Sequence, residues 1–366
     1  NEKSVPKEPN WEPGLSDDRV KKMTGSIRAT QPADLPALAE FLIRIYKFEP
    51  SDHHADPQFL EWKYLHPRDG WEGSRSYILE KDGQVVAHCG VCPVTLHLGN
   101  ENPGNKITVN SVTLTDWAAD PALPGVGIML YRKLMATAPV SFVIGGAPAT
   151  RLMLPRIGFR HVGEALTYAA WLRPWREFQM RPRNERSILR LLHGVTHPAR
   201  SSRQTHAGWD FAAVDKFDDS LIPLLNDTQR AWTFCRRTPA DLNYVLQCPC
   251  LKMQGFLLRR NGHLMGYFML GKGKPDWEAR LLDLMVNSAD ADDWNAACAA
   301  VTKAAVLDPE VCRIRALATF PILSHALASN GYWRQYKEPI MIYDPANLSD
   351  QALPVSFQLI DGDAGY

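Results

Sequence analysis

The stretch DPALPGVGIMLYRKLM, residues 120–135, determines the fold that the sequence predicts. Beyond Gly127 its apolar residues recur at the spacing of one helix face, so a helix is predicted to begin near Gly127. The stretch before it, ITVNSVTLTDWA at 107–118, alternates apolar and polar residues as a strand does. The sequence therefore predicts a strand, a tight turn rich in proline and glycine, and a helix.

The two glycines of this turn indicate a phosphate site. Gly125 and Gly127 allow a ligand to approach the backbone, and a helix that starts here leaves its first amide groups unpaired. Those amides, together with the positive end of the helix dipole, suit a bound phosphate. A turn that serves packing alone, with its amides bonded to water or to a side chain, is the alternative.

Composition limits the possible functions. The chain has 366 residues, which favours two domains, and its 45% hydrophobic and 22% charged residues are typical of a globular protein. A net charge of +1 gives no reason to expect nucleic-acid binding. No apolar run reaches the roughly 20 residues of a membrane span. Seven scattered cysteines indicate free thiols, so we expect a cytoplasmic protein.

Folding is predicted to start at residue 26. Residues 1–25 are rich in proline and charge and poor in aliphatic side chains, so a disordered or draped tail is expected. From 26 to 174 the patterns predict a strand, a helix, a hairpin turned at Asp82-Gly83 and a further strand. The glycine turn with its helix follows, and then a strand, a helix and a last strand.

The plan of 26–174 recurs further along the chain, which predicts a second domain at 211–366. DPQFLEWKYLHP (56–67) aligns without a gap on TPADLNYVLQCP (238–249). The matching pairs are Pro57 with Pro239, Leu60 with Leu242, Trp62 with Tyr244, and Pro67 with Pro249. Gly83 and Gly262, and then Gly158-Phe159 and Gly331-Tyr332, follow in the same order. A period this long indicates two domains and not a solenoid.

The two copies differ at the glycine turn. At the position of Gly125 the second copy reads LMVNSADADDWNAACAA (284–300), which is acidic and lacks glycine. Such a helix start should repel a phosphate. We therefore expect a degenerate second domain without a phosphate site.

The order of elements resembles the GNAT acyltransferase superfamily. The resemblance depends on GVG at 125–127 and on FVIGGAPATRLMLPRIGFRHVG at 142–163, and it covers 26–174 well and 217–345 more weakly. With the internal copy it implies a tandem-GNAT protein of the α+β class. Each of its two domains would be a mixed, mostly antiparallel sheet flanked by helices.

The resemblance also implies a cofactor site. In that superfamily the glycine turn holds the pyrophosphate of acetyl-CoA, and the preceding strand splays from its neighbour and pairs with the pantetheine arm. By position, Trp117, Ala118 and Ala119 would contact the pantetheine arm, and the amides of Leu123, Gly125, Val126, Gly127 and Ile128 would contact the phosphates.

The chain departs from the superfamily pattern at two positions. Ala122 begins the turn where Gln or Arg is usual, and Leu154 stands where a tyrosine often acts as general acid. Acyl transfer to an amine needs a base more than an acid, because a thiolate leaves readily. Asp116 is the first candidate for this base, followed by His161 and His88. The alternatives are a strand-end hydrogen-bonding role for Asp116 and core or surface roles for the histidines.

Two further patterns are weak. Cys89 and Cys92 form a CxxC sequence with strand-like flanks, which favours core thiols over a redox pair. His193 and His197 have the spacing of a metal pair on a helix, but a glycine and a proline nearby weaken that helix. No metal site is predicted.

An arginine-rich linker is predicted at 175–210, between the two domains. From Arg173 to Arg203 there are eight arginines against two glutamates. A solvated linker explains this charge, and contact with an anion such as the 3′-phosphate of CoA, an acidic sugar or RNA is the alternative. The final residues DGDAGY place Asp361 and Asp363 at a turn or at an acceptor-binding edge.

Together these patterns predict an acyl-CoA-dependent N-acyltransferase with acetyl-CoA as co-substrate. The acceptor would be a small-molecule amine or an amino sugar, bound between the two domains. Two alternatives stay open: a FemAB-like aminoacyl transferase that uses charged tRNA, and a non-catalytic acyl-CoA binding or regulatory module. Otherwise we expect no nucleic-acid or membrane partner, and the oligomeric state is left open.

Overall fold

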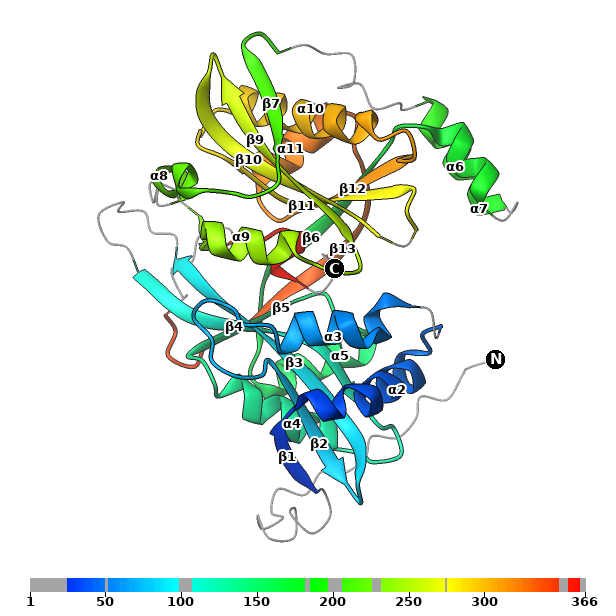
Figure 1. The fold of residues 1–366 in the computed structure, drawn as a ribbon, viewed down its shortest axis with the longest axis vertical. Helices are drawn as coiled ribbons and strands as arrows, with labels where there is room; N and C mark the ends of the chain where they lie inside the picture. Colours follow the sequence, from blue (N-terminus) through cyan, green and yellow to red (C-terminus); the bar gives the residue numbers. More distant parts are fainter. Residues whose placement is uncertain are drawn as a thin grey trace, which may run out of the picture.

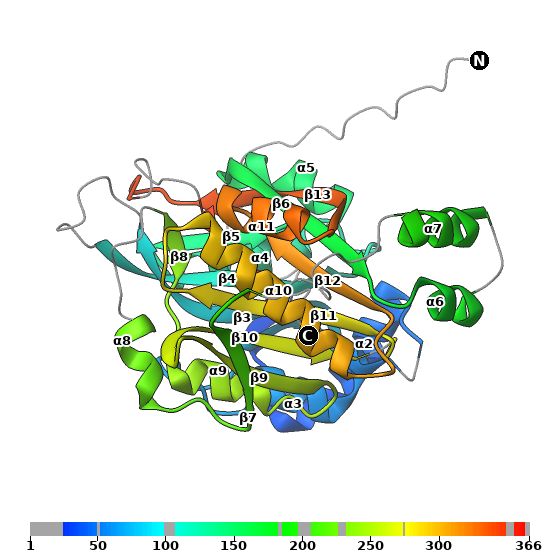
Figure 2. The ribbon, with the colours of Figure 1, turned by 90° about the horizontal axis from the view of Figure 1, so that it is seen from above.

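The computed structural model describes residues 25–49, 52–98, 107–181, 185–196, 206–225, 232–273, 275–348 and 355–362. The tail expected at 1–25 lies almost entirely outside the described residues, and so do His197 and Asp363. Figure 1 shows two halves stacked along the long axis, each with strands and helices of its own, and Figure 2 shows the molecule from above.

The first half follows the order expected from the sequence (Figure 1). Its strands are β1 Ser26–Ala29, β2 Ser76–Lys81, β3 Gln84–Leu98, β4 Ile107–Ala119, β5 Val140–Ile144 and β6 Arg160–Trp171. Its helices are α2 Leu35–Tyr46, α3 Pro57–Tyr64, α4 Val126–Met135 and α5 Pro148–Met153, with 3₁₀ turns at Pro32–Asp34, His53–Ala55 and Leu154–Ile157. The predicted strand at 107–118 is β4, and α4 begins one residue before the predicted start.

Local chemistry accounts for two of these elements. Asp82 and Gly83 have φ angles of 50° and 74° in the turn between β2 and β3, as a two-residue hairpin requires. Helix α4 buries Leu130, Tyr131 and Leu134 on the apolar face that the sequence predicts.

The second half repeats this order. Its strands are β7 Trp209–Val214, β8 Thr233–Cys235, β9 Lys252–Arg260, β10 His263–Lys272, β11 Glu278–Val286, β12 Arg313–Ala318, β13 Trp333–Tyr343 and β14 Val355–Ser356. Its helices are α8 Ile222–Leu225, α9 Pro239–Leu246, α10 Ala291–Leu307 and α11 Pro321–Ser329, with 3₁₀ turns at Asp219–Leu221 and Leu359–Asp361. Helix α9 corresponds to α3, strand β11 to β4, and helix α10 to α4.

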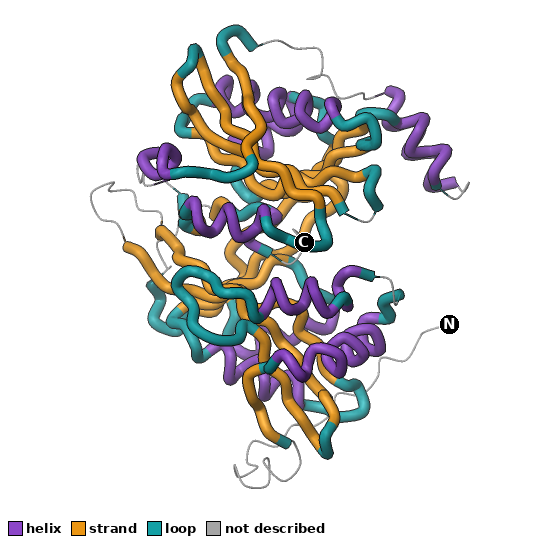
Figure 3. The backbone as a smooth tube through the Cα atoms, viewed as in Figure 1, coloured by secondary structure: helices purple, strands orange, loops and turns teal. Residues whose placement is uncertain are grey.

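One sheet runs through both halves, because each half gives its last long strand to the other. The main strand order is β1-β2-β3-β4-β5-β13-β6-β12-β11-β10-β9-β7. Strand β13 lies between β5 and β6, and β6 lies between β13 and β12, all in antiparallel pairs. Figure 3 shows these strands passing through both halves with helices packed against them. The predicted α+β class is confirmed, and the exchange joins the two expected sheets.

Trp62 and Tyr244, which the internal repeat aligns, contact each other where the halves meet. Their rings stack with centroids 4.9 Å apart. The Nε1 atom of Trp62 donates to the carbonyl of Tyr244 (3.3 Å), and the hydroxyl of Tyr244 donates to the carbonyl of Trp62 (2.6 Å). In this reciprocal contact α3 and α9 take equivalent positions, as the alignment of their sequences predicts.

Helices α6 Pro174–Met180 and α7 Glu185–Thr196 occupy part of the expected linker and project to one side of the molecule (Figures 1 and 2). Arg173 donates to the carbonyls of Asp308 (3.0 Å) and Val306 (2.8 Å) at the end of α10. Arg181 donates to the carboxylate of Glu177 (2.8 Å). These two arginines thus donate hydrogen bonds to oxygen atoms of the protein itself. None of the described helices is long and apolar enough to cross a membrane.

Candidate functional site

Strands β4 and β5 pair over only three residues each, in the middle of β4 and at the beginning of β5. Residues 111–113 pair with 140–142, whereas the rest of β4 pairs with β3 alone. A notch therefore opens between the two strands along 114–119. The amide of Asp120 donates to Val86 in β3 (2.8 Å), so by the alternation of a strand the peptide groups of Ala119 and Trp117 face the notch.

This alternation divides the three residues expected to contact a pantetheine arm by the direction of their peptide groups. Trp117 and Ala119 present their peptide groups to the notch, whereas those of Ala118 face β3. The carbonyl of Trp117 already accepts a hydrogen bond from the hydroxyl of Tyr46 (2.9 Å). The peptide of Ala119 and the amide of Trp117 are thus the groups that a ligand in the notch can reach.

The turn between β4 and α4 carries free amide groups at the expected phosphate site. Gly125 has φ 92°, in the left-handed region that glycine adopts without strain. The amides of Leu123 and Val126 bond within the turn, at 3.0 and 3.5 Å. Among the described residues, no acceptor meets the amides of Gly125, Gly127 and Ile128. Three such amides at a helix N-terminus suit an anion.

Gly127 also has a packing role. A Cβ atom at this position would lie 2.8 Å from the Cβ of Ala119 and 3.2 Å from the indole nitrogen of Trp117. That nitrogen donates to the carbonyl of Gly127 (3.0 Å). The absence of a side chain at Gly127 therefore lets α4 approach β4 closely, and it holds the free amides beside the notch.

Asp116 lies where β4 bulges away from β3. The pairing shifts between His88 and Gly90, and Asp116 has φ 47°, which is strained for a residue with a side chain. Its Oδ2 atom accepts hydrogen bonds from the ammonium of Lys63 (2.6 Å) and from the hydroxyl of Tyr64. The predicted base thus lies beside the notch, tied to the end of α3.

No pattern in the sequence singled out Lys63 and Tyr64. Both follow Trp62 in the segment that the repeat aligns, so the alignment marked their helix without marking their role. Their partner is more than 50 residues away in the chain. A contact of this range leaves no local pattern.

Of the two predicted histidines, the structure brings only His88 to Asp116: its Nδ1 atom lies 3.0 Å from the backbone carbonyl of Asp116. His161 lies exposed on β6, where its Nε2 atom is 3.5 Å from the carboxylate of Glu164. No contact between described residues joins His161 to Asp116. His88 is completely buried and has hydrogen-bond partners at both ring nitrogens. Leu154, at the place of the usual acid, is also buried.

The second half has the same notch, but the chain fills it. Residues 278–281 of β11 pair with 313–316 of β12, and the strands then separate. The side chain of Gln358 enters there: its Oε1 accepts from the amide of Leu284 and its Nε2 donates to the carbonyl of Leu284, both at 2.8 Å. Its Nε2 also donates to Asp283 (2.9 Å). One amide side chain thus occupies both backbone groups of a residue in the notch.

The segment around Gln358 is fixed at both ends. The ring of Phe357 stacks on Phe142 of β5, with centroids 4.4 Å apart. The carboxylate of Asp361 lies 2.7 Å from the guanidinium of Arg237, whose side chain is 12% exposed. The nearby carboxylates hold the pKa of Arg237 above its ordinary value, although burial acts in the opposite direction. The second notch is therefore part of the protein interior.

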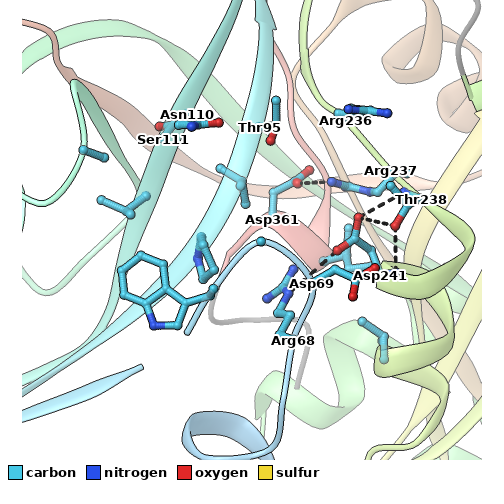
Figure 4. A pocket seen from close by; sticks show the side chains of 18 of the residues that line it. Arg68, Asp69, Thr95, Asn110, Ser111, Arg236, Arg237, Thr238, Asp241 and Asp361 are labelled. Carbon is cyan, nitrogen blue, oxygen red and sulfur yellow. Dashed lines mark hydrogen bonds and ion pairs between the residues drawn. The ribbon is translucent and has the colours of Figure 1, made fainter. Parts of the chain in front are cut away.

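A polar cavity of about 420 Å³ lies between the two halves (Figure 4). Its walls come from the loop after α3, from β3 and β4, and from the segment before α9. Figure 4 shows Asp361 directed at Arg237, and Asp241 beside Thr238 and Arg68. The polar side chains that line it are Arg68, Asp69, Thr95, Asn110, Ser111, Arg236, Arg237, Thr238, Asp241 and Asp361.

The weaker sequence patterns have ordinary surroundings. All seven cysteines are free thiols; Cys89 is buried and Cys92 is partly exposed. The side chain of His193 and all of His197 lie outside what the structure describes. Among the described residues, possible metal ligands lie within 4.8 Å of one another at Asp52, His53 and His54.

The fold is that of the GNAT acyltransferases. A GCN5-related N-acetyltransferase from Anabaena variabilis is similar at 12% identity and a TM-score of 0.56, over 87% of this chain and 72% of that one. A second, from Kribbella flavida, is also similar at 12% identity and 0.56, over 88% and 71%. N-myristoyltransferase from Saccharomyces cerevisiae, solved with myristoyl-CoA, is similar at 12% identity and 0.58, over 94% and 85%.

Similarity at the level of sequence was not found. No protein-family model matches the chain, and no curated protein matches it. The likeness to the solved structures therefore establishes the fold, and the function has to be argued from the site.

Proposed function

We propose that the chain is an acyl-CoA-dependent N-acyltransferase that binds its acyl-CoA in the notch between β4 and β5. The observation that carries this proposal is the set of free amides at Gly125, Gly127 and Ile128, beside a strand edge with peptide groups facing the notch. A pyrophosphate matches the amides and the helix dipole. An amide-containing arm matches the peptide of Ala119 and the amide of Trp117.

The proposal assigns one acyl-CoA to each chain. In the second half Gln358 already bonds the amide and the carbonyl of Leu284. The start of α10 carries Asp290, Asp292 and Asp293, which oppose an anion at that helix end. Acetyl-CoA is the co-substrate we propose first, and N-acetyl transfer is the activity.

The acyl thioester, when bound, supplies an activated carbonyl for attack by an amine. We propose that Asp116 accepts the proton of the acceptor ammonium. Its carboxylate, which accepts hydrogen bonds from Lys63 and Tyr64, is the proton acceptor that the site offers beside the notch. His161, which lies apart from Asp116, stays a prediction as an alternative base.

The cavity between the halves is the place we propose for the acceptor. Ser111 lines this cavity, and Thr113 and Thr115, which alternate on the same face of β4, line a small cavity next to Lys63. A polar face thus leads along β4 from the larger cavity to Asp116. A small polar amine, such as an amino sugar, suits these walls.

Calorimetric titration with acetyl-CoA and with free CoA tests the proposal. We expect micromolar binding to the wild-type chain and none to Gly125→Asp, which places a carboxylate among the free amides. Gly262→Asp is the matched control, because Gly262 has φ 80° and an added Cβ there meets nothing within 4 Å. Loss of binding in both variants, or no binding by the wild type, contradicts the proposal.

Turnover is measured separately, as release of free CoA in the presence of amines. Binding without turnover on any amine would instead favour the acyl-CoA binding or regulatory module. Binding of charged tRNA, together with no binding of acyl-CoA, would favour the aminoacyl transferase. The first titration therefore decides which of the three activities is pursued.

A further inference from the structure

A buried chain of hydrogen bonds runs across the sheet from β1 to β4, the strand that borders the notch. The hydroxyl oxygens of Thr30 and Ser76 lie 2.6 Å apart, and that of Ser76 lies 2.9 Å from Nε2 of His88. The Nδ1 atom of His88 lies 3.0 Å from the carbonyl oxygen of Asp116. Thr30, Ser76 and His88 are at most 2% exposed. The chain runs from the end of β1 through β2 and β3 to the bulge in β4.

The bond between His88 and the carbonyl of Asp116 determines that one ring nitrogen of His88 carries a proton. A carbonyl oxygen only accepts hydrogen bonds, so Nδ1 of His88 has to carry a proton. The hydroxyl of Ser76 can then satisfy Nε2, and Thr30 can satisfy Ser76. Each buried polar group in the chain obtains a partner in this arrangement.

The carbonyl that His88 holds belongs to a strained residue. Among the described residues outside glycine, Asp116 is the one with a positive φ inside a strand; the others lie at turns and helix ends. A left-handed conformation there is strained and persists only when its surroundings impose it. Lys63 and Tyr64 hold the side chain of Asp116, whereas His88 holds its backbone.

The second half lacks this device. The hairpin glycines Gly83 and Gly262 align His88 with Tyr267, whose hydroxyl donates to the side chain of Asp283 (2.7 Å) and not to a backbone carbonyl. Leu284, the residue that Gln358 bonds in the filled notch, has no positive φ. A histidine ring that hydrogen-bonds a strained backbone carbonyl is thus found in the half whose notch is open.

We infer that His88 is a positioning residue that clamps the backbone of Asp116 through its Nδ1 proton and thereby sets the shape of the open notch. Its effect on ligand binding rests on the proposed function, whereas its protonation does not. The bulge turns β4 just before Trp117 and Ala119, whose peptide groups face the notch. Release of the carbonyl would let these groups rotate away from a ligand.

The first test measures the proton directly on the wild-type protein. A long-range ¹H–¹⁵N spectrum of the histidine rings shows which nitrogen is protonated, and the spectrum of His88→Asn identifies the signal of His88 among the 11 histidines. We expect a protonated Nδ1. A neutral ring with its proton on Nε2 would overturn the inference.

The second test separates positioning from stability with a matched pair of variants. The amide nitrogen of Asn lies as many bonds from Cα as Nδ1 of histidine, and that of Gln as many as Nε2. His88→Asn therefore keeps a donor for Asp116, and His88→Gln keeps a partner for Ser76. We expect His88→Asn to bind acetyl-CoA within about threefold of the wild type, and His88→Gln to bind about tenfold or more weakly.

Urea unfolding of both variants measures the loss of stability with which the loss of affinity is compared, because each variant loses one buried hydrogen bond. Equal losses of affinity in the two variants would show that His88 acts through stability alone and would overturn the positioning role. If the wild type binds no acetyl-CoA, the proposed function fails, and the ring spectrum still decides whether the clamp exists.

Discussion

Replacement of Gln358 by methionine tests whether the second notch is truly closed by the chain. Methionine has a similar length but cannot hydrogen-bond the backbone. Gln358 is 7% exposed, so Gln358→Met leaves the amide and the carbonyl of Leu284 without their partner in a buried place. Each such group costs about 1–3 kcal/mol.

One further term reduces this cost, and another adds to it. Burial of the apolar methionine side chain returns about 1–2 kcal/mol. Asp283 keeps the bonds from Arg237 (2.9 Å) and Tyr267 (2.7 Å) to its Oδ2 atom, but its Oδ1 atom loses the bond from Gln358 (2.9 Å), which adds to the cost. Taken at the middle of their ranges, these terms lower the free energy of unfolding by at least about 2–3 kcal/mol, measured by urea titration with tryptophan fluorescence and circular dichroism.

The control is Gln335→Met, at an exposed position on β13. A surface substitution of this kind changes the free energy of unfolding by about 0.5 kcal/mol or less. If Gln358→Met costs no more than the control, the side chain does not seal the notch and our account of the second half is wrong. The stoichiometry gives a separate check: acetyl-CoA should bind once per chain to the wild type, and binding of two would contradict the closed notch.

Three further measurements test other parts of the structure. Gly127→Ala should weaken acetyl-CoA binding and lower the free energy of unfolding by about 1–3 kcal/mol, because the added methyl overpacks the contact of α4 with β4; unchanged calorimetry and urea unfolding would contradict this. In the native protein a thiol reagent should label Cys92 and Cys250 fast and the five buried cysteines only on unfolding, so rapid reaction of more than two thiols would contradict the burial. Hydrogen bonds from Arg28 hold the pKa of Asp34 below its ordinary value, so this carboxylate stabilises the fold above its unfolded pKa of about 4, and the stabilisation disappears as the pH falls through the folded pKa. Asp34→Asn should cost up to about 1 kcal/mol at pH 7 and progressively less in urea titrations below pH 4, whereas a cost independent of pH would contradict the assignment.

Local patterns account for the part of the fold that the sequence predicted. The alternation at 107–118 and the apolar face after Gly127 are properties of neighbouring residues, and they predicted β4 and α4 to within one residue at the junction. The hairpin at Asp82-Gly83 depends on two residues that accept positive φ. The glycines of the turn likewise marked the place where the structure has free amides.

Contacts between distant residues account for what the sequence did not show. Lys63 and Tyr64 meet Asp116 across more than 50 residues, and Gln358 meets Leu284 across 74. None of these residues stands in a recognisable pattern. The exchange of β6 and β13 is equally hidden, because each strand has the same alternation whichever half it joins. Long-range pairing of this kind is decided by packing of the whole sheet.

The internal repeat and the exchange of strands together explain why one plan yields two different halves. The filled second notch ties the segment after β13 to β11, and β13 itself pairs with β5, which forms one side of the open notch. The same contacts that remove the second site therefore support the first. Charge acts in the same direction, because the start of α10 has Asp290 as its cap where α4 has glycine, so an anion is disfavoured there even apart from Gln358. Packing and charge thus independently disfavour an anionic ligand in the second half, which under the proposed function leaves the half with free amides as the binding site.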